Sequence, residues 1–174
     1  MAARNVYSIW IVPSGPVKER LANQVKRLSR SNGVTPFEPH LTLVKGIRMA
    51  ERDAVRNTKE LASSWKGFTI LLGRPSSSGN FFKSIFIKVQ KSRALVKAYR
   101  RASAAFRLRA VPYRPHVSLV YARLPAPRRR SIIRGLDMRG ISGKFTANNL
   151  HLHMTEGKLK DWRCVYRTRI SDRK

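Results

Sequence analysis

Two copies of one hexapeptide carry the residues of this sequence that are best suited to acid–base chemistry. The first copy reads Pro-His-Leu-Thr-Leu-Val from residue 39, and the second reads Pro-His-Val-Ser-Leu-Val from residue 115. Each copy places a histidine two residues before a hydroxyl: His40 with Thr42, and His116 with Ser118. Successive side chains of a strand point to opposite faces. We therefore expect two strands that each present an imidazole and a hydroxyl on one face and aliphatic groups on the other.

A single His-x-Thr on a strand is most often an ordinary hydrogen-bonded or solvent-facing pair. Its repetition within the same apolar frame favours a catalytic interpretation, because burying a sheet does not require the polar pair to recur, whereas a site built from two similar halves does. Two imidazoles can act as base and acid near neutral pH. Two hydroxyls can hold a phosphate between them, and in-line displacement at phosphorus needs base and acid on opposite sides. The pattern predicts phosphodiester chemistry without a metal, since neither hexapeptide contains a carboxylate.

The remaining sequence predicts alternating strands and helices. Apolar runs of period two, or continuous ones, indicate strands, and amphipathic runs indicate helices. We expect strands at 7–12, 39–44, 68–72, 81–89, 115–120, 145–155 and 162–170, a loop at 73–80, and helices at 17–31, 49–65, 91–108 and 126–136. This order places one hexapeptide in each half of the chain. It predicts one α+β domain (1–174) of two lobes related by an approximate two-fold, with the histidine strands facing each other across a groove.

The charge of the chain is an argument about its partners. Lys and Arg number 37 against 9 Asp and Glu, which gives a formal net charge of +28. Such an excess favours binding to a polyanion, with RNA or DNA ahead of an anionic membrane. A generally basic surface without a specific partner is the alternative that the composition leaves open.

Cysteine content and hydrophobicity limit the cellular setting. Cys164 is the single cysteine, which excludes an internal disulfide and a cysteine-rich zinc module and is typical of the cytoplasm or nucleus. No segment approaches the ~20 apolar residues of a membrane span. The apolar run 6–12 is interpreted as a first strand ended by Pro13, so a cleaved signal peptide is not expected. We expect a monomer that binds no membrane.

The paired motifs resemble those of the 2H phosphoesterase superfamily. Within it, segments 36–42 (Pro-Phe-Glu-Pro-His-Leu-Thr) and 115–121 (Pro-His-Val-Ser-Leu-Val-Tyr) are similar to the cyclic phosphodiesterases associated with tRNA splicing, as is the late segment with Thr155 and Trp162. The resemblance implies a bilobal fold of two pseudo-symmetric antiparallel β-sheets with outer helices around a central cleft. It also implies metal-independent opening, without a cofactor, of ADP-ribose 1″,2″-cyclic phosphate and nucleoside 2′,3′-cyclic phosphates, the latter to a 2′-phosphate.

The resemblance assigns roles to five residues. It implies that His40 and His116 are catalytic, and that three residues bind substrate: Thr42, Ser118 and Tyr121. We assign His116 as the base that activates water and His40 as the acid that protonates the leaving oxygen. Tyr121 lies an odd number of residues after His116, so in a straight strand the two side chains would point to opposite faces. The ring of Tyr121 therefore reaches the site only if the strand bends or bulges. The matching offset in the first copy is Lys45, either a substrate contact or a solvated lysine.

The large positive charge keeps two other functions open. A mononucleotide needs only a few cations, so the substrate can instead be an RNA end, as in related RNA 2′,3′-cyclic phosphodiesterases and 2′,5′ ligase-like proteins. A non-catalytic basic RNA-binding module on the same fold is the third possibility, and the two intact histidine–hydroxyl pairs argue against it.

Four further residues have a structural and a functional interpretation. His151 and His153 share a face of one strand, but no Cys, Asp or third His stands at ligand spacing, so we expect no metal site and interpret them as a polar outer face. Phe82 and Trp162 are interpreted as core residues, with an aromatic wall for a nucleobase as the alternative.

Overall fold

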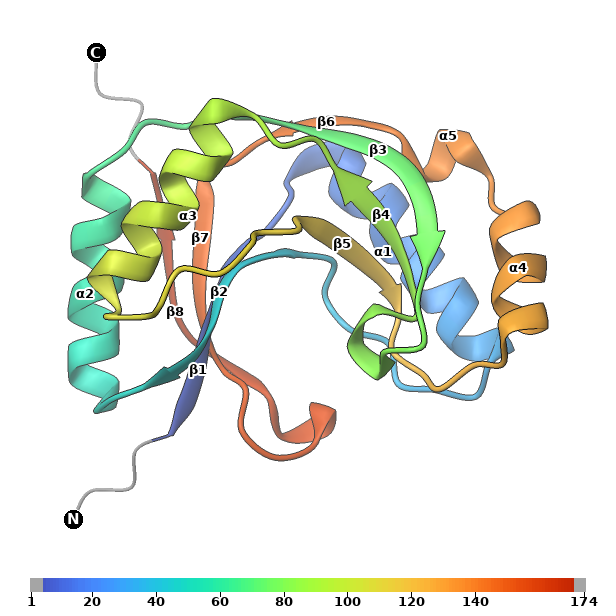
Figure 1. Cartoon of the computed structure of the whole chain (residues 1–174), viewed down its shortest axis with the longest axis horizontal. Helices are drawn as coiled ribbons and strands as arrows, with labels where there is room; N and C mark the ends of the chain where they lie inside the picture. The colour runs from blue at the N-terminus through green and yellow to red at the C-terminus, as the bar shows by residue number, and fades with distance from the viewer. Residues whose placement is uncertain (1–4, 171–174) are drawn as a thin grey trace.

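The computed structural model describes residues 5–170 and contains one curled, fully antiparallel sheet of eight strands in the order β6-β3-β4-β5-β2-β1-β7-β8 (Figure 1). The strands are β1 (Val6–Ile11), β2 (Leu41–Arg48), β3 (Thr69–Ser77), β4 (Ile85–Val89), β5 (His116–Val120), β6 (Gly143–Thr146), β7 (Asn149–Met154) and β8 (Arg163–Arg169). The α-helices are α1 (Gly15–Ser31), α2 (Glu51–Ser63), α3 (Arg93–Ala105), α4 (Ala126–Arg134) and α5 (Met138–Ile141). Two 3-10 turns, η1 (Phe81–Lys83) and η2 (Leu159–Asp161), complete the described elements.

The sheet consists of two four-stranded halves, which we call lobe A (β2-β1-β7-β8) and lobe B (β6-β3-β4-β5). The strands that carry the two hexapeptides, β2 and β5, join the halves through a single paired position, Leu41 with Val117. The expected α+β class and bilobal arrangement are confirmed. The two expected sheets are continuous with each other, because this one pair links them.

Two of the helices, α1 and α3, pack on the lobe opposite to that of the strand they follow. α2 and α3 pack on lobe A, against β7, β8 and β2, whereas α1 and α4 pack on lobe B, against β5, β6 and β3. Figure 1 shows these two groups of helices on the outer sides of the curled sheet. α1 follows a lobe A strand and α3 follows a lobe B strand, so each lobe takes elements from both halves of the sequence.

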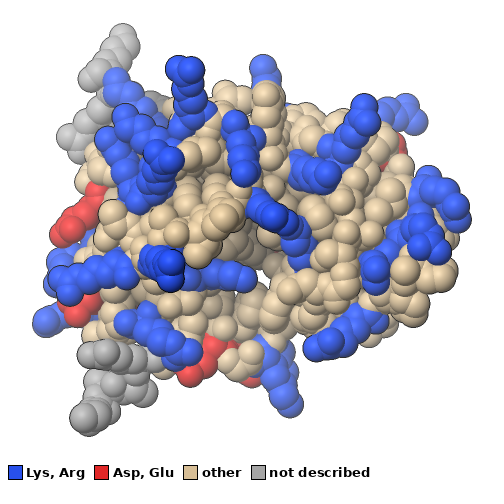
Figure 2. Space-filling view, in the orientation of Figure 1, with Lys and Arg blue, Asp and Glu red and all other residues tan. Residues whose placement is uncertain are grey.

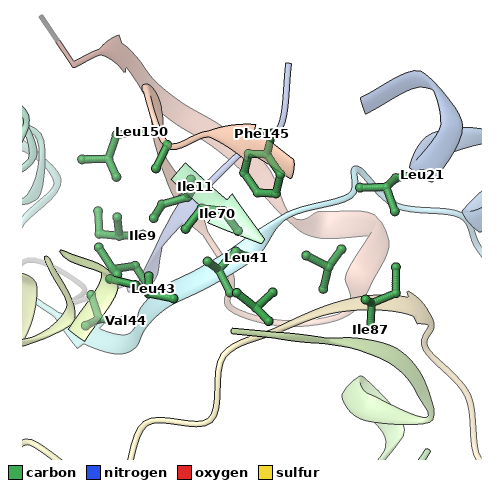
Figure 3. Close-up of a cluster of buried hydrophobic side chains, with 14 of the residues drawn as sticks. Ile9, Ile11, Leu21, Leu41, Leu43, Val44, Ile70, Ile87, Phe145 and Leu150 are labelled. Carbon is green, nitrogen blue, oxygen red and sulfur yellow. The ribbon is translucent and has the colours of Figure 1, made fainter. Parts of the chain in front are cut away.

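The alternation of strand residues decides which face meets the helices. Ile9 and Ile11 of β1, Leu41 and Leu43 of β2, and Leu150 of β7 are fully buried in one apolar cluster (Figure 3). Burial of each such side chain contributes roughly 1.5–3 kcal/mol. The intervening residues of the same strands therefore point to the opposite, concave face of the sheet.

The expected strand at 145–155 is wrong, because two strands occupy this range and lie in different lobes. β6 pairs with β3 of lobe B, and β7 pairs with β1 of lobe A. The chain passes from one lobe to the other at residues 147–148. Asn148 and Asn149 interrupt the apolar pattern there, and neither Gly nor Pro marks the break.

Residues 73–89 also differ from the prediction. The expected loop at 73–80 is strand as far as Ser77, and the expected strand from residue 81 begins only at Ile85. Phe81–Lys83 form a 3-10 turn that begins where the side chain of Asn80 accepts a hydrogen bond from the backbone N–H of Phe82. α5 was not expected from the sequence. Among the described residues, none of the helices has the length and apolar character needed to cross a bilayer.

Candidate active site

A cavity of about 900 Å³ lies where the two lobes meet, and both hexapeptides line it. Its walls include all five residues to which the sequence assigned roles: His40, Thr42, His116, Ser118 and Tyr121. Lys45 lines it as well. The structure thus brings together residues that lie up to 81 positions apart in the chain.

The pairing of β2 with β5 explains this convergence. The two strands are antiparallel, and their one paired position, Leu41 with Val117, is the middle residue of both His-x-Thr/Ser motifs. One residue to either side of this pair, the antiparallel register places His40 opposite Ser118, and Thr42 opposite His116. Residues that face each other across an antiparallel pair point to the same side of the sheet. All four polar groups therefore occupy the concave face while Leu41 and Val117 enter the core.

His40 is deeply buried and has a defined tautomer. Its side chain hydrogen-bonds through Nδ1 to the backbone oxygen of Glu38 at 2.7 Å. A carbonyl only accepts, so Nδ1 carries the proton, and Nε2 is the free acceptor of the neutral ring. Nε2 lies 3.4 Å from the Tyr121 hydroxyl, which donates to it. The ring stacks on Trp10 with centroids 3.5 Å apart and planes 3° from parallel.

The same burial makes His40 a weak base in the free protein. His40 is 4% exposed, and this burial lowers its pKa from the usual 6.5 to about 4, against the opposing effect of the Glu38 carbonyl. The imidazole is therefore neutral near pH 7 when the cavity holds no anion. A bound phosphate would favour the imidazolium and raise the pKa of His40.

His116 repeats this local geometry in the other motif. Its Nδ1 donates to the backbone oxygen of Arg114 at 2.9 Å, again the residue that precedes the motif proline. Proline fixes φ near −65°, so the preceding carbonyl is held at a similar place in both motifs. Burial lowers the pKa of His116, and the positive charges of Lys83 and Lys45 act in the same direction. A neutral imidazole with a free Nε2 is suited to act as a general base.

The serine hydroxyl already has a backbone partner. Ser118 Oγ is buried and donates to the backbone oxygen of Phe82 at 2.8 Å. Its hydrogen must rotate away from this carbonyl before it can donate to a ligand in the cavity. Thr42 is half-buried on the cavity wall, and its backbone oxygen accepts a hydrogen bond from the Tyr113 hydroxyl at 3.1 Å.

Tyr121 reaches the cavity because β5 ends at Val120, so strand parity no longer applies to it. Its ring stacks on Phe37 with centroids 3.7 Å apart, and its hydroxyl points to His40. Burial raises the pKa of Tyr121, so it stays a protonated hydrogen-bond donor at neutral pH.

The two aromatic residues with open interpretations both line the cavity. Phe82 and Trp162 stack with centroids 5.5 Å apart and planes 21° from parallel. Phe82 is 47% exposed, so the core interpretation is wrong for this residue. Trp162 is half-buried.

Sequence reasoning missed several residues of the cavity wall. Trp10 separates His40 from His153, on which its other face stacks at 3.6 Å. Its position on β1, two residues after the polar Ser8, was the available signal, because period two places both on the concave face. Three more cations, Lys83, Arg109 and Arg114, line the cavity together with Lys45, which the sequence had already suggested.

The interpretation of His151 and His153 as a polar outer face is wrong. Both lie on the concave side of β7 and are 8% and 7% exposed. Cys164 of β8 pairs directly opposite His153, although it is distant in sequence. The spacing of residues along β7 could not predict Cys164 as a neighbour, because this contact depends on the pairing of β7 with β8.

A family model described as the 2′-5′ RNA ligase superfamily matches residues 13–159, which is most of the chain. The chain belongs to this superfamily. The 2H phosphoesterase resemblance of the paired motifs is thereby confirmed. A curated cyclic phosphodiesterase of Arabidopsis thaliana is 28% identical over 123 residues, which are 70% of this chain and 67% of that protein.

Solved structures share the fold of this superfamily member. A protein of Thermus thermophilus superimposes with a TM-score of 0.68 at 18% identity, covering 95% of this chain and 97% of the other. LigT of E. coli in its apo form gives a TM-score of 0.64 at 14% identity, covering 97% and 98%. LigT is also known in complex with 3′-AMP, with a TM-score of 0.61 at 15% identity and coverage of 97% and 99%.

Proposed function

We propose that this superfamily member is a metal-independent cyclic phosphodiesterase that opens cyclic phosphates by water attack between two histidines. The observation that carries the proposal is the matched geometry of His40 and His116. Each has Nδ1 held by a pre-proline carbonyl, so Nε2 is the nitrogen available for proton transfer, and each lines the same cavity. The hydroxyls of Thr42 and Ser118 lie beside them and can donate to phosphate oxygens.

The reaction follows from these positions. His116 Nε2 takes a proton from water as the water oxygen attacks phosphorus, and the bond from phosphorus to one ring oxygen breaks. His40 Nε2–H protonates that leaving oxygen, which gives an alcohol and a phosphomonoester. The negative phosphate favours the protonated form of His40 that this step needs. His116 then returns its proton to solvent and His40 regains one.

Nucleoside 2′,3′-cyclic phosphates, opened to 2′-phosphates, and ADP-ribose 1″,2″-cyclic phosphate are the proposed substrates. The stacked pair Phe82 and Trp162 offers an aromatic surface for a base. The name of the Arabidopsis relative and the 3′-AMP complex of LigT support a nucleotide substrate.

The test is hydrolysis of nucleoside 2′,3′-cyclic monophosphates in excess EDTA, with the products separated by phosphate position. We expect a 2′-phosphate from the wild type. His40→Ala and His116→Ala should each reduce turnover by a factor on the order of a hundred or more, the usual range for lost acid–base catalysis. Folded variants with near-native rates would refute the two-histidine mechanism.

A second candidate substrate is an RNA end with a cyclic phosphate. The net charge of +28 and the four cations of the cavity wall favour it. Lys and Arg are spread over most of the face seen in Figure 2, with few acidic residues between them.

Salt dependence separates the two substrates. When a protein contacts many phosphates of an RNA, binding weakens steeply with salt. For single strands, each phosphate contact lowers log K by about 0.7 for every unit increase in the logarithm of the salt concentration. A mononucleotide depends on salt only slightly. The test compares kcat/KM for a cyclic mononucleotide with kcat/KM for an oligonucleotide that ends in a cyclic phosphate, at several salt concentrations. Tight RNA binding without turnover of either would instead indicate a binding module.

A further inference from the structure

Four metal-ligand side chains that the proposed reaction does not use meet behind the wall of the cavity: Glu38, His151, His153 and Cys164. We call them the rear cluster. None of them lines the cavity. Trp10 separates His153 from the cavity residue His40, because one face of its indole stacks on His40 and the other on His153.

The fold assembles the rear cluster from three segments. His151 and His153 are two residues apart on β7 and therefore share a face. Cys164 lies opposite His153 on the neighbouring strand β8, which Figure 1 shows beside β7. Glu38 comes from the segment before β2 and contacts both histidines through its Oε2 atom.

The distances are close to those of a coordination sphere. Glu38 Oε2 lies 3.7 Å from His151 Nδ1 and 4.0 Å from His153 Nε2. The ligand atoms of the two histidines and of Cys164 all lie within 4.8 Å of one another. Ligand atoms around a tetrahedral zinc lie roughly 3.3–3.8 Å apart, given bonds of about 2.0–2.3 Å. Movements of about 1 Å or less would close His151, His153 and Cys164 around one ion, and Glu38 lies beside the two histidines as a fourth ligand.

Two atoms of the rear cluster have unmet bonding capacity. His151 Nδ1 and His153 Nε2 are buried and form no hydrogen bond with any described residue. Both residues are more than nine-tenths buried. Buried polar nitrogens are nearly always paired, because an unpaired one costs about 1–3 kcal/mol. The distances from both to Glu38 Oε2 exceed hydrogen-bond length.

The outer contacts orient the ligands. Lys18 Nζ binds the other carboxylate oxygen of Glu38 at 2.9 Å, which leaves Oε2 directed at the histidines. Arg167 Nε donates to Cys164 Sγ at 3.3 Å. Partners of this kind fix metal ligands in their binding orientation.

We propose that the rear cluster binds one divalent transition-metal ion, and that zinc fits it best. Two neutral imidazoles, a thiolate and a carboxylate are all zinc ligands, and together they balance the +2 charge of the ion. Binding releases the thiol proton of Cys164. With Glu38 as the fourth ligand beside His151, His153 and Cys164, no open position remains, so the site is structural and no step of the phosphodiester reaction passes through it.

The test is direct zinc binding by the whole chain, free of any affinity tag and stripped with a chelator. Equilibrium dialysis against Zn²⁺, with zinc and protein quantified, should give one ion per chain. Cys164→Ser and His151→Gln should each weaken binding by about a hundredfold or more, since even outer contacts of a metal site are worth 10–100-fold. His116→Ala is the matched control, because it removes a cavity histidine and should leave zinc binding unchanged.

A second measurement needs no variant. Co²⁺ in place of Zn²⁺ should give the wild type a thiolate-to-cobalt charge-transfer band, which reports Cys164 as a ligand. Circular dichroism checks that the substituted proteins are folded. Substoichiometric zinc, a cobalt complex without the thiolate band, or zinc lost in His116→Ala but kept in Cys164→Ser would each overturn the proposal. The last result would place the ion in the cavity.

Discussion

Leu41 of β2 pairs with Val117 of β5 at the one position where the two halves of the sheet are hydrogen-bonded to each other. Each residue is the centre of its own His-x-Thr/Ser motif, so the approximate two-fold of the motifs passes through this pair. The register sets each histidine opposite the hydroxyl of the other motif. In the proposed reaction, the base and the hydroxyl on one side of the phosphate therefore come from different strands.

This crossed arrangement predicts that both hydroxyls contribute to phosphate binding. Thr42→Val and Ser118→Ala each remove one donor to the phosphate with little change of shape. A hydrogen bond to a charged group contributes about 1.5–3 kcal/mol. We expect kcat/KM for a cyclic nucleotide to fall about 10- to 100-fold in each variant.

Two exposed positions provide matched controls for these variants. Thr69→Val on β3 and Ser131→Ala on α4 make the same chemical changes outside the cavity, and both should keep wild-type kcat/KM. Loss of activity in only one of Thr42→Val and Ser118→Ala would show that a single motif holds the phosphate.

A second prediction concerns the Tyr121 hydroxyl. Tyr121→Phe keeps the ring stacked on Phe37 and removes only the group 3.4 Å from His40 Nε2. We expect kcat to fall about tenfold, equivalent to about 1.4 kcal/mol, because the His40 ring loses the hydroxyl that orients it. Single-turnover rates of cyclic nucleotide opening measure this step. Tyr166→Phe on β8 is the control, and an unchanged rate in Tyr121→Phe would exclude a role for the hydroxyl.

The sequence predicted what is local and repeated. Period two placed each histidine with its hydroxyl, and the duplication showed that two such strands belong to one cavity. It could not predict long-range pairing. The pair Asn148 and Asn149 marks an interruption between two apolar stretches, but it does not indicate that the chain leaves lobe B for lobe A.

The same limit explains the residues missed around the site. Trp10 contacts His40 only because β1 lies next to β2 in the sheet. Cys164 meets His153 only because β8 lies next to β7. Both contacts depend on strand order, which hydrophobic periodicity does not encode. Tyr121 lies in the cavity because β5 ends one residue earlier, a boundary of the kind that sequence patterns place poorly.

A third prediction tests the aromatic pair as a base-binding surface. Phe82→Ala and Trp162→Ala each remove a ring from the stacked pair on the cavity wall. Stacking is worth about 1–3 kcal/mol per base, so KM for a nucleoside 2′,3′-cyclic phosphate should rise about 5- to 100-fold while kcat changes less. Ribose 2′,3′-cyclic phosphate, which lacks a base, is the control substrate. A similar loss on both substrates would show that the rings support the fold of the cavity instead.

The last prediction is that the protein loses stability as the pH falls below 6.5. Burial lowers the pKa of His40 to about 4 and that of His153 to about 3 from the usual 6.5. Below pH 6.5 the unfolded chain therefore binds protons that the folded protein does not, and the free energy of unfolding decreases with falling pH. The pKa shift of His40 alone corresponds to about 3 kcal/mol by pH 4. Well above pH 6.5 these groups are neutral in both states and contribute no slope.

Urea denaturation measures the free energy of unfolding at pH 7.5, 6.5, 5.5 and 5.0, which roughly span the range in which histidines titrate. The measurements are made with EDTA present and in high salt, which screens the net positive charge. Glu38 has little effect on stability in this pH range, because the pKa of its carboxyl is lowered from the usual 4.5 to about 2, and both values lie below the lowest pH measured. His153→Gln removes one buried imidazole that must stay neutral, so its stability should fall less steeply with decreasing pH than that of the wild type. A wild-type unfolding free energy that stays constant from pH 6.5 to 5.0 would mean that His40 and His153 are hydrated enough to titrate normally. The stacking of both rings on Trp10 would then not seal them from water.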